Sequence, residues 1–194
     1  SISKGNSYGF ELLAQQKMSS SIYGILSATY YFSRFEDKDG NLISSSWDNR
    51  FILNMTAGKK FKNNIELGFK YRYSGGSPYT PIDIINSSNK IIWDINQQAV
   101  LDYNLLNTQR LNGSHVLDIR IDKKWFFKSW GLNAYIDIEN ILNSKTELPS
   151  QYGIDPNLGT IVEGTGVDAS SYPLYEIINN SGTVLPSIGL LIEF

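Results

Sequence analysis

Apolar and polar residues alternate along seven stretches of this chain, a period-2 pattern typical of β-strands with one apolar and one polar face. In one stretch, Leu132, Ala134, Ile136 and Ile138 alternate with Asn, Tyr, Asp and Glu. Each stretch has roughly the 9–11 residues with which a tilted strand crosses a bilayer. The predicted strands cover residues 8–17, 22–33, 50–60, 65–73, 116–125, 132–140 and about 185–194.

The links between the predicted strands alternate strictly in length. Short links cover residues 17–21, 61–64 and 126–130, and long polar links cover residues 34–49, 74–114 and 143–184. A soluble β-sandwich has no physical reason to sort its loops in this way. A transmembrane barrel does, because its periplasmic turns are short and its extracellular loops are long.

Aromatic residues gather at both predicted ends of the strands, as they do at the two interfaces of a membrane. The short-turn end has Phe61, Trp125, Phe126, Phe127 and Trp130, and the long-loop end has Tyr30, Tyr31, Phe32, Tyr71 and Tyr73. Together with the strands and links, these two girdles predict an all-β fold, a transmembrane antiparallel β-barrel.

Seven crossings cannot close a bacterial barrel that has both chain ends in the periplasm. If the short turns are periplasmic, residue 194 lies in the periplasm and residue 1 lies outside the cell. We therefore expect residues 1–194 to form the carboxy-terminal segment of a larger barrel. The first and last strands should pair with further strands, since an unpaired strand edge in lipid costs several kcal/mol per group.

Composition narrows the function classes. The chain contains 12 Tyr, 9 Phe and 4 Trp, and its net charge of -2 provides no basic surface for nucleic acid. The absence of cysteine excludes disulfides and thiolate metal sites. No apolar run reaches 18 residues, so the sequence predicts no transmembrane helix. We expect no cofactor.

Three stretches resemble, in order and spacing, the last strands of TonB-dependent outer-membrane receptors. They are YRYSGGSPYTP (71–81), TQRLNGSHVLDIRIDKKWFFKSWGLNAYIDIENILN (108–143) and SGTVLPSIGLLIEF (181–194). The resemblance is closest to Bacteroidota-type receptors that carry an amino-terminal carboxypeptidase-regulatory-like domain. It implies a 22-stranded barrel around a plug, which imports a scarce nutrient across the outer membrane of a Gram-negative bacterium. Siderophore, vitamin, glycan and peptide all remain open as cargo.

The resemblance also implies partners and one signal residue. The partners are the remaining strands and the plug of the same receptor, TonB through an amino-terminal part outside these residues, the barrel-assembly machinery and the lipid bilayer. A surface lipoprotein is a further candidate partner. Phe194 would be the aromatic carboxy-terminal residue that the assembly machinery recognises; the alternative is a core residue of a soluble sandwich.

Charged residues on the polar parity of the strands are candidates for a network in the barrel lumen. They are Lys70, Arg72, Asp118, Arg120, Asp122, Asp137 and Glu139. Pairing of residues 116–125 with 132–140 would place Arg120 beside Asp137 or Tyr135. Carboxylate pairs can act as acid and base, but a polar lumen needs mixed charges without catalysis. With His115 as the only histidine, we expect no catalytic residue and no metal site.

The opposite parity is predicted to face lipid, and the long loops are predicted to meet cargo. The lipid-facing set includes Leu117, Ile119, Ile121, Leu132, Ala134, Ile136 and Ile138. The candidates for substrate contact are the loop aromatics Trp47, Tyr79, Trp93, Tyr103 and Tyr152, because aromatic faces on loops grip sugars, peptides or chelates. Two alternatives stay open: an outer-membrane enzyme or adhesin barrel, and a soluble β-sandwich binding module.

Overall fold

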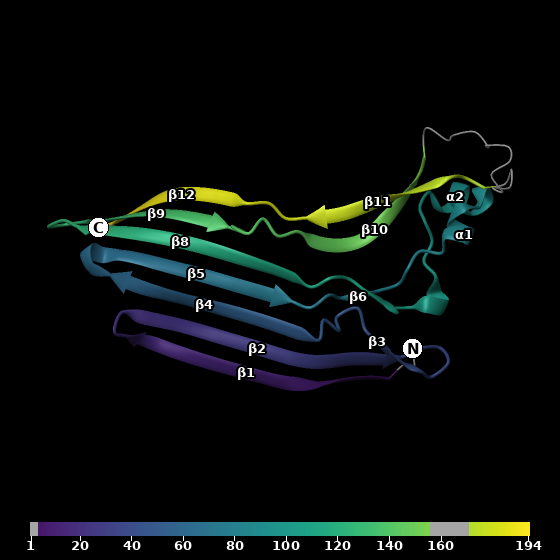
Figure 1. Cartoon of the computed structure of the whole chain (residues 1–194), viewed down its shortest axis with the longest axis horizontal. Coiled ribbons are helices and arrows are strands. Elements are labelled where there is room, and N and C mark those ends of the chain that lie inside the picture. Colours follow the sequence, from purple (N-terminus) through teal and green to yellow (C-terminus); the bar gives the residue numbers. More distant parts are fainter. Residues whose placement is uncertain (1–3, 156–170) are drawn as a thin grey trace.

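A single large antiparallel sheet dominates the computed structural model, which describes residues 4–155 and 171–194 (Figure 1). The strand order is β1-β2-β4-β5-β8-β9-β12, and the short β3 pairs with β2. The bounds are β1 (Gly5–Ser19), β2 (Ile22–Glu36), β3 (Leu42–Ser44), β4 (Phe51–Phe61), β5 (Ile65–Ser74), β8 (Ser114–Phe126), β9 (Gly131–Glu139) and β12 (Leu185–Glu193).

All seven predicted strands are present, and the prediction of a mostly β chain is confirmed. The largest differences are at the long-loop end, where β1 and β2 extend beyond their predicted limits so that Gly5 lies opposite Phe35. Polar residues such as Asn6 and Ser7 interrupt the apolar alternation there. Pairing continues nevertheless, because ladder hydrogen bonds join backbones whatever the side chains are.

The strand registers place most apolar residues of all seven strands on one side of the sheet. Ile136 of β9 lies opposite Ile121 of β8 and opposite Ile188 of β12. Directly paired residues project to the same side, so these contacts define a continuous apolar face. The apolar face includes Phe10, Leu12, Leu26, Ala28, Leu53, Met55, Phe69, Tyr71, Leu117, Ile119, Ile121, Leu132, Ala134, Ile136, Ile138, Ile188 and Leu190.

No second layer packs over the apolar face within residues 4–155 and 171–194. The one buried hydrophobic residue among them is Trp93, 7 % exposed, and it lies in a loop helix rather than in the sheet. Phe10 and Ile188 on the apolar face are 83 % and 80 % exposed. The sheet therefore has an apolar surface without a protein core.

The two ends of the sheet differ in structure (Figure 1). The three short turns lie together at one end. In the first of them Ser20 and Ser21 adopt positive φ, as a tight hairpin turn requires, and the second contains a 3-10 turn, Lys62–Asn64. The long links lie at the other end and carry their own elements. These are β6 (Pro78–Tyr79), α1 (Ile84–Ser88), α2 (Lys90–Asn96), a 3-10 turn (Tyr103–Leu105), β7 (Gln109–Arg110), β10 (Thr146–Ile154) and β11 (Leu174–Ser181).

The sheet is open within the described ranges, because β1 and β12 form its two edges and do not pair with each other. Seven antiparallel strands also leave β1 and β12 running in the same direction. No helix among the described residues has the length and apolar character needed to span a membrane.

Candidate functional site

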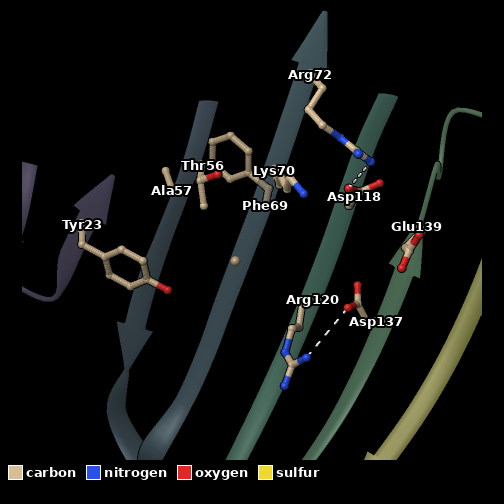
Figure 2. A pocket seen from close by; sticks show the side chains of 11 residues that line it. Tyr23, Thr56, Ala57, Phe69, Lys70, Arg72, Asp118, Arg120, Asp137 and Glu139 are labelled. Carbon is tan, nitrogen blue, oxygen red and sulfur yellow. Dashed lines mark hydrogen bonds and ion pairs between the residues drawn. The ribbon is translucent and has the colours of Figure 1, made fainter. Parts of the chain in front are cut away.

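The polar face of the sheet carries all seven of the predicted charged residues. Lys70 and Arg72 come from β5, Asp118, Arg120 and Asp122 from β8, and Asp137 and Glu139 from β9. All but Asp122 line a hollow of about 330 Å³ on this face, together with Tyr23 of β2 and Thr56 of β4 (Figure 2). The prediction that these charges gather on one face is confirmed.

Arg120 forms the centre of the charge network on β8 and β9. Its guanidinium donates two hydrogen bonds of 2.9 Å to Asp122, and a third nitrogen lies 3.8 Å from the Asp137 carboxylate. The guanidinium carbon also lies 3.8 Å from the centroid of the Tyr135 ring, which is a cation–π distance. The predicted position of Arg120 is confirmed for both Asp137 and Tyr135, and Asn133 completes the cluster with a hydrogen bond to Asp122.

A second ion pair joins β5 to β8. Arg72 donates to the nearly buried Asp118 carboxylate at 2.9 Å, and the backbone N–H of Asn140 donates to the same carboxylate at 2.9 Å. The cation that neutralises Asp118 therefore comes from β5, whereas the cation that neutralises Asp122 and Asp137 comes from β8. The sequence predicts Arg72 on the same face but not its pairing with Asp118, because the two residues are 46 positions apart.

The geometry of the polar face does not assemble a catalytic group from His115. That histidine lies opposite Tyr73 in the β5–β8 register and so shares the side of the sheet with the apolar residues, away from the carboxylates. Within the described residues, no group of three or more His, Cys, Asp or Glu side chains is arranged to hold a metal ion.

A buried carboxylate ties two of the long loops together. Asp48 is 0 % exposed and accepts hydrogen bonds from the backbone N–H of Ser33, from the Ser44 hydroxyl and from Arg110, the last at 3.0 Å. Arg110 belongs to β7 and also donates to the Gly76 carbonyl at 2.6 Å. The pair was missed from the sequence, because a loop aspartate and a loop arginine 62 positions apart give no local signal.

The five loop aromatics predicted to contact substrate lie in different surroundings. Tyr79 and Tyr152 line one cavity of about 500 Å³ between β6 and the β10–β11 hairpin. Tyr103 lines a separate hollow of about 350 Å³ beside the link between β2 and β3. Trp47 is 81 % exposed, whereas Trp93 is buried inside its own loop. The structure therefore brings only Tyr79 and Tyr152 together in a shared cavity.

The Tyr152 side chain in this shared cavity has a raised pKa. Burial raises the pKa of Tyr152, and the nearby Glu176 and Tyr79 raise the pKa further. Tyr152 lies directly opposite Glu176 in the β10–β11 pair. The Tyr152 phenol therefore keeps its proton, as a hydrogen-bond donor, to a higher pH than an ordinary tyrosine does.

The terminal residue lies just beyond the sheet. Strand β12 ends at Glu193, and the Phe194 side chain is fully exposed.

No protein-family model matches the chain, and neither a curated protein nor a solved structure matches it. The sheet, its two faces and its loops are therefore the basis for assigning a function.

Proposed function

We propose that this chain is the carboxy-terminal part of the β-barrel of a TonB-dependent receptor, which imports a scarce nutrient across the outer membrane of a Gram-negative bacterium. The observation that carries this proposal is the apolar face, which extends over seven strands and has no protein layer over it in the described residues. The sequence resemblance of residues 71–81, 108–143 and 181–194 supplies the family.

Lipid is the environment that suits the apolar face. Exposed apolar surface in water is unfavourable by about 25 cal/mol per Å², and soluble monomers rarely expose contiguous apolar patches above a few hundred Å². Side chains such as Phe10, Leu12, Ile136 and Ile188 would all remain in water if the sheet were soluble as it stands. In a bilayer the same side chains meet hydrocarbon and need no second protein layer.

The polar face suits the interior of a wide barrel. Its charges form ion pairs within the sheet, as Arg72 does with Asp118 and Arg120 with Asp122. Paired charges of both signs are compatible with a hydrated lumen that packs against a polar plug. Because these charges neutralise each other in pairs, their role is to stabilise the lumen wall rather than to catalyse a reaction.

The two ends of the sheet suit opposite sides of the membrane. Short turns at one end are typical of the periplasmic side, and long loops with their own helices and hairpins are typical of the extracellular side. On this orientation the cavity between Tyr79 and Tyr152 opens among the extracellular loops. Phe194 lies at the periplasmic side, where it would serve as the assembly signal.

The open edges support a larger barrel. The strands β1 and β12 run in the same direction, so an all-antiparallel closure requires an odd number of additional strands. A 22-stranded barrel, as in outer-membrane transporters, would supply fifteen. Each edge would then pair fully, which removes the cost of unpaired backbone groups in lipid.

Fractionation of cells that produce the intact receptor tests this proposal. The protein should stay in the outer-membrane fraction after carbonate washing, and the folded form should migrate differently from the heated form in gel electrophoresis. Protease added to whole cells should cut the long loops and leave the short turns intact. Recovery of this chain as a monomer in detergent-free buffer would contradict the proposal.

A further inference from the structure

The cavity between β6 and the β10–β11 hairpin has the size and lining of a ligand site. Its volume of about 500 Å³ lies in the range that encloses small ligands. Its walls are mainly apolar and aromatic. They include Tyr79, Pro81, Ile82, Leu101, Leu148 and Tyr152.

An irregularity in the hairpin shapes this cavity. The β10–β11 register shifts between Leu148 and Gln151, so Pro149 and Ser150 bulge out of the ladder. Both bulged residues line the cavity. A bulge changes the direction of the side chains that follow it, and natural proteins use bulges next to functional sites.

One carboxylate without a counter-charge faces the same cavity. Glu176 lines it and lies opposite Tyr152 in the β10–β11 pair, so the two side chains project to the same side of the hairpin. The Glu176 side chain is exposed and forms no hydrogen bond or ion pair with other described residues. Glu176 is the only carboxylate among the described lining residues, and none of those residues is Lys, Arg or His. The cavity therefore offers one negative charge, with no cation among its described lining residues to balance it.

We propose that this cavity binds a cationic ligand group, an alkylammonium or guanidinium, carried by an apolar body of the size of a short peptide. Glu176 accepts hydrogen bonds from the cation, and the rings of Tyr79 and Tyr152 contact the apolar part of the ligand and the face of its cation. An anionic chelate would meet Glu176 without any compensating charge.

This inference deepens the proposed function, and it rests on that function only for the claim that the bound molecule is cargo. It separates the nutrient classes that the sequence leaves open, because it favours a basic peptide over an anionic siderophore complex. Binding at the cavity is measurable whether or not the receptor transports.

Calorimetric titration of the intact receptor in detergent tests the inference. The probe is the tripeptide Leu-Arg-Leu, acetylated and amidated at its ends, and the matched probe replaces arginine by the neutral isostere citrulline. The arginine peptide should bind at least about tenfold more tightly, since hydrogen bonds to charged groups are the stronger ones. Equal affinity of the two peptides, or no binding of either, would overturn the proposal.

Variants assign the binding to the cavity. Glu176→Gln should weaken the arginine peptide at least about tenfold and leave the citrulline peptide unchanged. Asp39→Asn, at the same end of the sheet but outside this cavity, is the control and should change neither affinity. Tyr152→Phe should retain binding, whereas Tyr152→Leu should weaken it. A Glu176→Gln receptor with unaltered preference for arginine would refute the site.

The two proposals fail in different ways. A receptor that resides in the outer membrane but binds neither peptide contradicts the cationic site alone. A chain that binds the arginine peptide but behaves as a soluble monomer contradicts the proposed import function alone.

Discussion

Arg120 of β8 lies directly opposite Asp137 of β9, with 3.8 Å between a guanidinium nitrogen and a carboxylate oxygen. The same guanidinium holds Asp122 at 2.9 Å and lies over the Tyr135 ring. One cation thereby links acidic residues of two neighbouring strands on the polar face. Like charges on adjacent strands repel, so the strand pair depends on the arginine that separates them.

Replacing Arg120 by glutamine should destabilise the folded receptor by about 1–2 kcal/mol, because Asp122 and Asp137 then lack their shared cation. The cost stays moderate because this cluster is partly exposed to solvent. Urea unfolding in lipid vesicles measures the change. The double variant Arg120→Gln, Asp122→Asn should recover part of the loss. Lys70→Gln, which removes a cation that forms no ion pair in the described residues, is the control.

An arginine on the apolar face should be far more costly than one on the polar face. Ile136→Arg should reduce the free energy of unfolding by about 2–4 kcal/mol if residue 136 lies near the bilayer midplane. Ser27→Arg, on the polar face opposite Asn54, should change it little. Unfolding in vesicles measures both. Similar costs for the two arginines would show that the face assignment is wrong.

The start of α1 should lose stability in acid. The backbone N–H and the side chain of Asn86 donate to the Asp83 carboxylate and hold the pKa of that group below its ordinary value. The pKa of the Asp83 carboxyl is lower in the folded protein than in the unfolded chain, where it is near 4. Its stabilisation of the folded loop is therefore fully present above about pH 4 and is lost as the pH falls through the pKa of the folded state.

Pepsin cleavage of this loop at pH 2 and pH 4 measures the effect. Asp83→Asn keeps a capping oxygen without a titrating proton, so it is the matched control. The ratio of the cleavage rate of the natural protein to that of Asp83→Asn should be greater at pH 2 than at pH 4. A ratio that stays the same at both pH values would remove Asp83 from this role.

Deleting residues 86–104 from the intact receptor should abolish or weaken cargo capture and leave barrel assembly intact. The deletion removes α2 with its buried Trp93 and also removes Leu101, which lines the cavity beside Tyr152. The sheet has no strand in this segment. Growth under limitation of the imported nutrient measures capture, and the receptor level in the outer membrane measures assembly. Unchanged growth would exclude this loop from capture.

Ile85→Ser is the matched control for that deletion, because it changes an exposed side chain of the same loop and removes no backbone. It should leave both growth and receptor level unchanged.

The long strands were predictable because one local rule decides them. In β9, strict alternation of Leu132, Ala134, Ile136 and Ile138 with polar residues fixes both the strand and its faces. The short turn to β8 then fixes the register that places Arg120 beside Asp137. Local pattern and tertiary pairing agree in this hairpin, so the sequence was sufficient there.

The loop elements were not predictable, because non-local contacts decide them. In β10, Pro149 and the bulge interrupt the period of two, and the pairing with β11 bridges residues far apart in the chain. The pair of Asp48 and Arg110 and the pair of Arg72 and Asp118 likewise join distant positions. The cavity between Tyr79 and Tyr152 depends on such contacts and not on any motif.

Spin-label accessibility along β9 tests whether one face of the sheet meets lipid. The chain has no cysteine, so single cysteines can be placed at residues 134, 136 and 138 and at residues 133, 135 and 137 of the receptor in vesicles. The labels at the even positions should collide with oxygen, which concentrates in lipid, and should be shielded from a water-soluble nickel complex. The labels at the odd positions should not show this preference for oxygen. Equal access of the nickel complex to both sets of labels, or a preference of the odd positions for oxygen, would show that the even face of β9 does not meet lipid.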